Sequence, residues 1–270
     1  VFRSQNAKQV TLKSKGVLLL YSENSQLDYK RLAELSARLA EYYLDVPSTI
    51  VKLDVVQENI RTFRYEDGVE TIAWNNIGRY DAYNLSPYDE TILIDTDYFV
   101  QNDNLANYFG SNQDFLCHNS SYDITGNEIF RHNRFLENGG NGFEMRWATV
   151  IYFKKNKHAK QIFDTWRTIY ENYGYYGRLL GFRRNPFRND FALSIAHNIC
   201  NGYANTNTFV HNLPAISTTD SVVDYGNNNW LIKYNLRNSK NIMRYKGDLH
   251  VMNKKCILQT DVYGKLWNSV

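Results

Sequence analysis

One segment constrains this chain more than any other. Residues 91–97, TILIDTD, form an apolar run that ends in two aspartates. Side chains alternate between the two faces of a strand, so Asp95 and Asp97 point to one side while Thr96 points to the other. A carboxylate that follows a buried strand is costly to desolvate unless a cation or several hydrogen-bond donors meet it. Because Mg²⁺ and Mn²⁺ prefer oxygen ligands, the pair predicts a metal site and an enzyme that acts on phosphate esters.

The amino-terminal part of the chain predicts a β-α-β unit. Residues 17–21, VLLLY, are typical of a buried strand, and a polar turn follows at 22–25. Between 28 and 45 the apolar residues recur every three or four positions, which predicts an amphipathic helix that stops before Pro47. Residues 49–55 form the next strand. Two strands joined through a helix by short turns predict parallel pairing in one sheet.

The rest of the chain continues this alternation of strands and helices. Long loops or a small insertion are expected across 119–142, and short strand-like pieces across 230–270. The fold class is therefore α/β, with a central, mostly parallel sheet flanked by helices. Ligands of such sheets bind beyond the carboxyl ends of the strands, where residues 22–24 and the two aspartates lie. The other elements that we expect are strands at 114–118 and 147–153 and helices at 158–173 and 190–199.

Composition excludes few classes of function. The net charge of +3 neither requires nor excludes a nucleic-acid partner. The three cysteines are far apart and include no CxxC pair, which argues against a disulfide framework or a zinc knuckle and favours a reducing compartment.

Nothing in the sequence predicts a membrane span or a signal peptide, since the apolar runs are short and the basic amino end lacks an apolar segment. The abundance of Asn, Lys, Tyr and Ile is typical of AT-rich genomes, such as those of some bacteria and phages. We therefore expect a soluble cytoplasmic protein, in the cytoplasm of the host cell if the gene belongs to a phage.

The two aspartates belong to a longer segment that resembles a known family. Residues 79–97, RYDAYNLSPYDETILIDTD, are similar to the run through the DxD motif of GT-A fold glycosyltransferases, and most similar to glycosyltransferase family eight and its relatives. Segments at 145–153, 189–193 and 247–255 resemble, in the same order, a strand, a helix start and the closing histidine segment of that family. Residues 146–148 lack the family's Asn and Gly, and the closing segment lacks its Pro-Trp ending.

The resemblance implies a single GT-A (Rossmann-like) domain over residues 1–270. Its nucleotide-sugar-binding half is expected at 16–110, its acceptor-binding half at 111–256, and a C-terminal tail at 257–270. In that family two aspartates and a histidine bind the metal, which assigns Mn²⁺ or Mg²⁺ to Asp95, Asp97 and His250. The donor is expected to be a nucleoside diphosphate sugar, with a UDP-sugar first. Its expected contacts are Tyr21, Ser22, Arg79, Asp95, Thr96, Asp97 and Lys254.

Several of these residues also have an ordinary structural explanation. His250 stands between two apolar residues and can be a core histidine whose hydrogen bonds are satisfied. Lys254 can lie at a solvated tip, and Arg79 can pair with Asp81 on the surface. The sequence alone leaves these alternatives open.

Asp190 is the candidate catalytic residue. Its place at the start of a helix has a plain explanation, because a carboxylate is favourable beside the helix N-terminus. In the family a carboxylate at this place lies near the reacting sugar and the acceptor. It can act there as a base, as a nucleophile or as a positioning group.

A basic and aromatic segment at 175–188 is the candidate acceptor-binding region. Arginines interleaved with aromatic residues suit a polyanion with exposed bases, while the alternative is a glycine-broken loop anchored by its aromatics. The acceptor is open among DNA with modified bases, an anionic glycan and a phosphorylated carrier. The arginines in question are Arg178, Arg183, Arg184 and Arg188.

The function that we expect is metal-dependent transfer of a sugar to a hydroxyl acceptor. A sugar nucleotidylyltransferase of the same fold is an alternative, but residues 22–25 lack the glycine-rich basic loop of that class. A phosphatase of the haloacid dehalogenase type needs Thr or Val where Phe99 stands. A non-catalytic nucleic-acid-binding protein explains the arginines but not the buried carboxylate pair.

Overall fold

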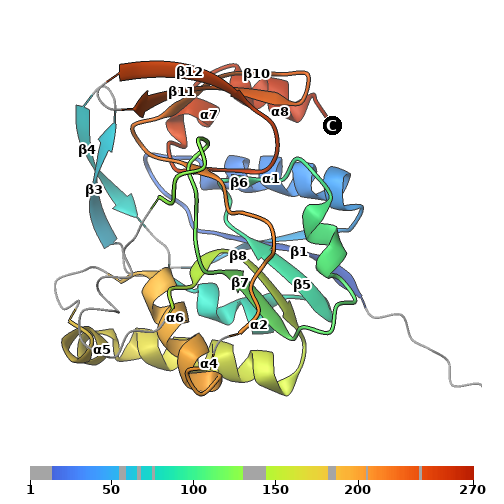
Figure 1. The fold of residues 1–270 in the computed structure, drawn as a ribbon, viewed down its shortest axis with the longest axis vertical. Coiled ribbons are helices and arrows are strands. Elements are labelled where there is room, and N and C mark those ends of the chain that lie inside the picture. The colour runs from blue at the N-terminus through green and yellow to red at the C-terminus, as the bar shows by residue number, and fades with distance from the viewer. Residues whose placement is uncertain are drawn as a thin grey trace, which may run out of the picture.

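The centre of the protein is a five-stranded sheet with the strand order β2-β1-β5-β8-β7 (Figure 1). Four strands run in one direction and β8 runs against them, so the expected α/β fold with a mostly parallel sheet is confirmed. The structure is a computed structural model, and the strands of this sheet are β1 (Lys15–Tyr21), β2 (Ser48–Lys52), β5 (Glu90–Ile94), β7 (Phe115–His118) and β8 (Trp147–Lys154). It describes residues 14–54, 59–65, 68–74, 77–129, 144–181, 187–204, 206–236 and 239–270.

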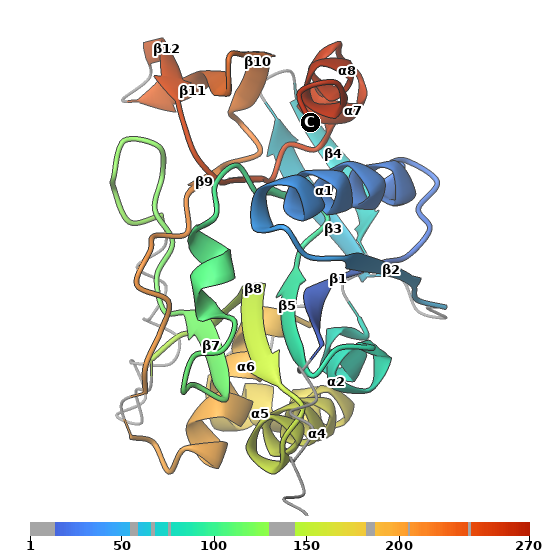
Figure 2. The ribbon, with the colours of Figure 1, turned by 90° about the vertical axis from the view of Figure 1, so that its right-hand side faces the viewer.

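Helices cover both faces of this sheet, as Figures 1 and 2 show. Helix α1 (Tyr29–Leu44) lies on one face, and α4 (Lys157–Glu171) and α6 (Asn189–Cys200) lie on the other. Each strand contributes to the hydrophobic core on both faces of the sheet, because successive side chains point to opposite faces. In β1, Val17 and Leu19 pack on the α1 side, whereas Leu18 and Leu20 pack on the α4 side.

The start of α1 agrees with the sequence prediction and has a local cause. Asp28 accepts a hydrogen bond of 2.9 Å from the backbone N–H of Arg31, which satisfies one of the free donors at the helix start. The helix ends at Asp45 in the left-handed conformation, two residues before Pro47. The predicted strands and helices before residue 55, at 114–118 and between 147 and 200 are confirmed with small changes in their bounds.

A second layer lies above α1 and consists of the carboxyl-terminal part of the chain (Figure 1). Short strand-like pieces were expected at 230–270. Leu249–Val251 is such a piece, whereas the rest of this range holds two longer strands of an antiparallel sheet and short helices. Residues 257–270, expected as a tail, bury Val262 and Leu266. The elements of this layer are β10 (Ser221–Gly226), β11 (Asn229–Leu236), β12 (Ser239–Tyr245), α7 (Lys255–Leu258) and α8 (Val262–Trp267).

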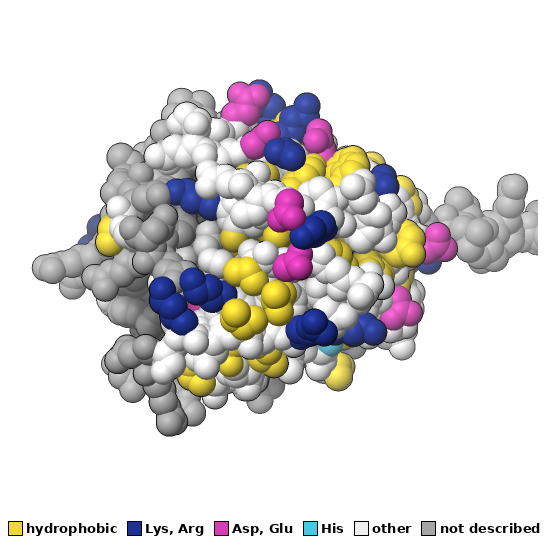
Figure 3. Space-filling view, turned by 90° about the horizontal axis from the view of Figure 1, so that it is seen from above, with side chains coloured by type: hydrophobic (Ala, Val, Ile, Leu, Met, Phe, Trp, Pro, Cys, Tyr) yellow, Lys and Arg dark blue, Asp and Glu magenta, His cyan; other side chains and the backbone are white. Residues whose placement is uncertain are grey.

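The outer face of this layer carries charges of both signs around small hydrophobic patches (Figure 3). Lys265 of α8 contacts Asp224 at 2.6 Å and Asp261 at 2.7 Å, so cations and anions alternate here. Exposed pairs of this kind add little stability. In the part of the chain that is described, no helix has the length and apolar character needed to cross a membrane.

Several short elements were absent from the sequence prediction. The segment at 175–179, expected as part of a loop, belongs instead to the short helix α5, which follows α4 directly. Residues 130–142 of the expected loop at 119–142 lie outside the described residues. The further elements are β3 (Asn59–Tyr65), β4 (Gly68–Trp74), a 3₁₀ turn η1 (Arg79–Asp81), α2 (Ala82–Leu85), η2 (Asn104–Tyr108) and α5 (Tyr173–Leu179).

A small three-stranded sheet connects the carboxyl-terminal layer to the end of β5. Its order is β6 (Tyr98–Phe99), β13 (Leu249–Val251) and β9 (Ala215–Ile216). In the antiparallel pairing of β6 with β13, His250 lies opposite Tyr98. This pairing brings the end of the chain to the two aspartates.

We predict that Gly16→Ala destabilises the fold. A Cβ on Gly16 would clash with the ring of Tyr88, whose hydroxyl is held by a 2.8 Å hydrogen bond with Thr49 Oγ1. Because the ring cannot move without losing that bond, the free energy of unfolding should fall by about 1–3 kcal/mol in urea denaturation. Gly264→Ala is the control, since nothing lies within 4 Å of its added Cβ. Equal stability of the two variants would contradict this packing.

Candidate metal and diphosphate site

Three possible metal ligands meet at the carboxyl edge of the central sheet. Asp95 follows β5, Asp97 precedes β6, and His250 lies in β13. One ligand atom of each lies within 4.8 Å of the other two. The backbone sets this approach, because the carbonyl of Asp97 accepts a 2.8 Å hydrogen bond from the N–H of Val251. The two aspartates and the histidine predicted from the sequence are therefore neighbours.

Asp97 is buried and has two basic partners. Lys254 Nζ lies 2.6 Å from its Oδ2, and His250 Nε2 lies 3.4 Å from its Oδ1. The side chains of Asp97, His250 and Lys254 are only 8%, 11% and 14% exposed. Burial would raise the pKa of Asp97, but the charges of Lys254 and His250 outweigh it and hold that pKa below its usual value. Asp97 is therefore an anion at neutral pH.

Asp95 is the more open of the two carboxylates, with 30% of its side chain exposed. Arg79, from η1, donates to Asp95 Oδ1 and to the carbonyl of Ala148 at the start of β8. The alternative in which Arg79 pairs with Asp81 is wrong, because Asp81 pairs with Arg167. Burial raises the pKa of Asp95, and the nearby charge of Asp97 adds to this, while Arg79 lowers it.

Asp190 lies beside this cluster, in the first turn of α6. Its Oδ1 accepts a 3.0 Å hydrogen bond from the N–H of Ala148, and its Oδ2 lies 3.1 Å from Nη2 of Arg188. The carbonyl of Ala148 accepts from Arg79, so a single residue, Ala148, connects Asp190 to the partner of Asp95. Both carboxylate oxygens thus have partners, and Arg188 neutralises the charge.

Asp248 is a supporting residue that the sequence did not reveal. It is buried, and it accepts hydrogen bonds of 3.0 Å from the hydroxyl of Tyr98 and 2.6 Å from the N–H of Gln101. Burial raises the pKa of Asp248 to about 6. These bonds hold β13, and with it His250, against the segment that carries Asp97. Because Tyr98 and Asp248 are 150 positions apart, no local pattern indicates their contact.

Tyr29 is a second residue that sequence reasoning missed. It is the first residue of α1, and its half-buried ring lies 5.9 Å from Lys254 Nζ, measured to the ring centroid. Burial raises the pKa of its hydroxyl. The positive charge of Lys254 lowers this pKa, while the negative charges of Asp97 and Asp95 raise it. The N-terminal end of α1 therefore forms one wall of the site.

The other predicted donor contacts lie along the same edge. Leu19 is paired with Ile94, so Tyr21 and Ser22 continue β1 alongside the segment with the two aspartates. Thr96 is buried, as expected for a side chain that points away from them.

Of the four predicted acceptor-binding arginines, the structure describes Arg178 and Arg188. Arg178 is exposed on α5, and Arg188 pairs with Asp190 instead of standing free on a loop. Arg183 and Arg184 lie outside the described residues.

An ion pair of 2.8 Å joins Lys52, which lines one hollow, to Glu23, which lines another. One of about 700 Å³ lies between the end of β2, η1 and α4, and Asp54 and Tyr80 are among its lining residues. The other, of about 270 Å³, lies between β1 and the start of α1. Gly78 and Tyr80, which flank Arg79 in the chain, line the larger hollow, whereas Arg79 itself projects toward Asp95.

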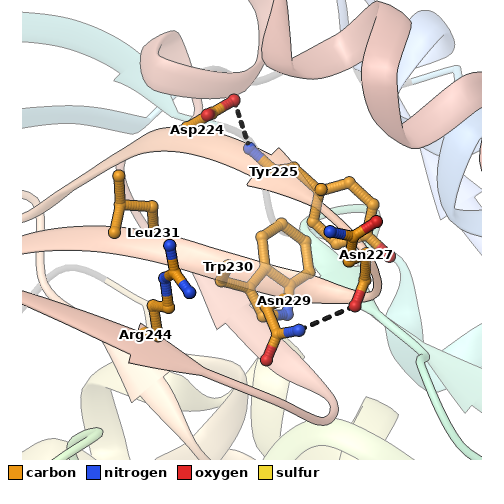
Figure 4. A pocket seen from close by; sticks show the side chains of 8 residues that line it. Asp224, Tyr225, Asn227, Asn229, Trp230, Leu231 and Arg244 are labelled. Carbon is orange, nitrogen blue, oxygen red and sulfur yellow. Dashed lines mark hydrogen bonds between the residues drawn. The ribbon is translucent and has the colours of Figure 1, made fainter.

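A third hollow lies apart from these residues, on the sheet β10-β11-β12. It holds about 190 Å³ and none of the predicted site residues lines it. In Figure 4 the rings of Trp230 and Tyr225 lie beside Asn227 and Asn229, with Arg244 on the neighbouring strand. The Nε1–H of Trp230 donates a 2.9 Å hydrogen bond to the carbonyl of Gly247, which anchors the turn that leads to His250.

Comparison with known proteins gives matches to solved structures only. No protein-family model and no curated protein sequence matches this chain. The structural matches include the galactosyltransferase LgtC in complex with donor and acceptor sugar analogues, with 12% identity, a TM-score of 0.40 and coverage of 67% of this chain and 70% of LgtC. The glycosyltransferase GlyE of Streptococcus pneumoniae TIGR4 has 14% identity and a TM-score of 0.34, over 69% of this chain and 43% of GlyE.

A mutant of Drosophila β-1,4-galactosyltransferase 7, in complex with manganese, UDP-Gal and xylobiose, has 12% identity and a TM-score of 0.34, over 94% of this chain and 98% of that one. The structural neighbours are thus glycosyltransferases, the class that the sequence resemblance named. TM-scores below 0.5 do not carry a function from one chain to another, so the function must be argued from the site.

We predict that Asp248→Ala weakens metal binding as well as stability. The variant leaves Tyr98 Oη and the N–H of Gln101 without an acceptor, which should cost about 1–3 kcal/mol in thermal unfolding. Because Asp248 helps to hold the metal ligand His250 in place, its loss should also weaken Mn²⁺ affinity about 10–100-fold in calorimetric titration. Asp248→Asn is the matched control, because its amide can pair with both groups and should rescue both properties. Unchanged Mn²⁺ affinity in Asp248→Ala would contradict the supporting role.

Proposed function

We propose that this protein is a metal-dependent glycosyltransferase that moves a sugar from a nucleoside diphosphate sugar to a hydroxyl acceptor. The observation that carries the proposal is the meeting of Asp95, Asp97 and His250 within 4.8 Å, with Lys254 and Arg79 beside them. Carboxylates with adjacent cations at the carboxyl edge of an α/β sheet suit a metal ion and a diphosphate together.

The residues present fit a divalent ion such as Mn²⁺ or Mg²⁺. Two carboxylates and one imidazole offer two oxygen ligands and one nitrogen ligand, a donor set that Mn²⁺ accepts readily. The buried, ionised Asp97 would supply a full negative charge, and the more exposed Asp95 leaves room for approach from solvent. When bound, the ion would act as a Lewis acid that neutralises charge on the departing diphosphate.

The donor is proposed to lie along the edge of the sheet with its diphosphate at Lys254 and Arg79. A diphosphate gains strongly from an ammonium and a guanidinium held in a partly dry site. Its nucleoside end would extend past Thr96 toward Tyr21 and Ser22. Lys52, which pairs with Tyr21 in the sheet, lines the hollow of about 700 Å³. We propose uridine as the nucleoside, in line with the sequence resemblance.

The transfer breaks the bond between the sugar's anomeric carbon and the diphosphate oxygen. The diphosphate leaves with the electron pair, and the acceptor hydroxyl loses its proton as the new glycosidic bond forms. Lys254 and Arg79 are proposed to stabilise the charge that grows on the leaving group. Asp190 is proposed as the carboxylate that faces the reacting sugar, with Arg188 and the N–H of Ala148 holding its orientation.

The acceptor is proposed to approach from the side of α5 and α6. Arg188 is next to Asp190, and Arg178 is exposed on α5. With Arg183 and Arg184 between them in the sequence, this side favours an anionic acceptor such as a nucleic acid or an anionic glycan.

Asp97→Asn should abolish metal-dependent turnover while the protein stays folded. Asn keeps the shape but loses the charge, so transfer or donor hydrolysis should fall by about 100-fold or more, since the metal contributes several kcal/mol. The measurement is release of nucleoside diphosphate in Mn²⁺. The control is Asp103→Asn, an exposed aspartate on a nearby segment, which should retain full activity. Full activity in Asp97→Asn would refute the metal assignment.

A thermal-shift screen separates the transferase from a non-catalytic binder. Nucleoside diphosphate sugars should raise the melting temperature only when Mn²⁺ is present, because ion and diphosphate share one site. The donor with the largest shift names the nucleoside and the sugar. A shift with nucleic acid alone, and with no nucleotide sugar, would favour the binder.

A further inference from the structure

Both carboxylates of the metal site already have a cation from the protein itself. Lys254 Nζ lies on Asp97 Oδ2 at 2.6 Å, and Arg79 pairs with Asp95. These two carboxylates and two cations cancel in charge. A divalent ion added to this cluster would lie close to an ammonium that is 14% exposed. Like charges at such a distance in a partly dry site repel strongly, so one of the two protein cations must move away from its carboxylate.

The contacts decide which of the two cations can yield. The guanidinium of Arg79 is fixed twice, on Asp95 and on the carbonyl of Ala148, and its side chain is 7% exposed. Among the described residues, the ammonium of Lys254 has two weaker contacts besides Asp97: a long hydrogen bond of 3.5 Å to the carbonyl of Met252, and the ring of Tyr29, whose centroid is 5.9 Å away. A lysine also has a flexible four-carbon stem, whereas an arginine fork is rigid. Lys254 is therefore the cation that can leave its carboxylate.

We propose that Lys254 is an exchangeable counter-ion: a divalent metal ion displaces its ammonium from Asp97, and the freed ammonium then binds the diphosphate of the donor. This inference rests on the proposed function and goes beyond it, because it sets how metal and donor binding are linked. In the protein without ligands, Lys254 keeps the buried charge of Asp97 paired. Once the ion takes over that task, the ammonium becomes a ready ligand for phosphate oxygens.

The exchange couples the two binding events. The ion must compete with Lys254 for Asp97 when no diphosphate is present. A bound diphosphate holds the ammonium away from Asp97 and so removes that competition. By linkage, metal and nucleoside diphosphate each raise the affinity for the other by the same factor.

The test is Mn²⁺ affinity, measured by electron paramagnetic resonance of the free ion with and without UDP. Lys254→Met removes the competitor, so Mn²⁺ alone should bind at least about fivefold more tightly than in the wild type. In the same variant, UDP should improve Mn²⁺ binding far less. Lys255→Met, the next residue in the chain, is the matched control and should behave as the wild type. Equal or weaker Mn²⁺ binding in Lys254→Met without UDP overturns the exchange.

A wild-type measurement protects the test if Lys254→Met does not fold. Reductive methylation followed by mass spectrometry reports the access of each lysine. Mn²⁺ should increase labelling of Lys254 relative to Lys255, and added UDP should protect it again. Labelling of Lys254 that Mn²⁺ does not change overturns the exchange. If the wild type binds no Mn²⁺ at all, the proposed function itself fails, which is a distinct result.

Discussion

The site depends on one short piece of backbone pairing. Strands β6 and β13 place His250 opposite Tyr98, and the carbonyl of Asp97 accepts the N–H of Val251. The buried Asp248 closes this pairing from the other side through the hydroxyl of Tyr98. Without this ladder Asp97 would lack its basic partners, and a buried carboxylate without a partner is costly. With it, the carboxyl-terminal part of the chain supplies both the histidine and the lysine.

The electrostatics of the site follow from the burial that this pairing creates. Three of the acidic groups have a basic partner: Asp97 has Lys254, Asp95 has Arg79, and Asp190 is paired with an arginine of its own helix start. Such a balanced cluster is stable without a ligand but has little net charge to attract one. A site of this kind binds a metal ion and a diphosphate best when both arrive together, because each replaces a contact that the other breaks.

The sequence predicted the frame of the protein well, and its contacts less well. Continuous apolar runs suffice to predict β1 and the strand before Asp95, and the helical period suffices for α1, because burial in the core produces those patterns. The convergence of His250 and Lys254 on the aspartates came only from the family resemblance, since no local pattern joins segments so far apart. Sequence reasoning missed Tyr29 and Asp248 for the same reason. The pairing of Arg188 with Asp190 is local, but it was missed because Arg188 was assigned to an acceptor-binding loop and Asp190 to a helix start.

Anomalous diffraction at the manganese edge tests the central claim most directly. Crystals grown with Mn²⁺ and UDP should give one strong anomalous peak within ligand distance, about 2–2.5 Å, of oxygen atoms of Asp95 and Asp97 and a nitrogen atom of His250. The ammonium of Lys254 should lie on phosphate oxygens and no longer on Asp97. A peak elsewhere on the molecule, or phosphates bound with no metal at these residues, would contradict the account.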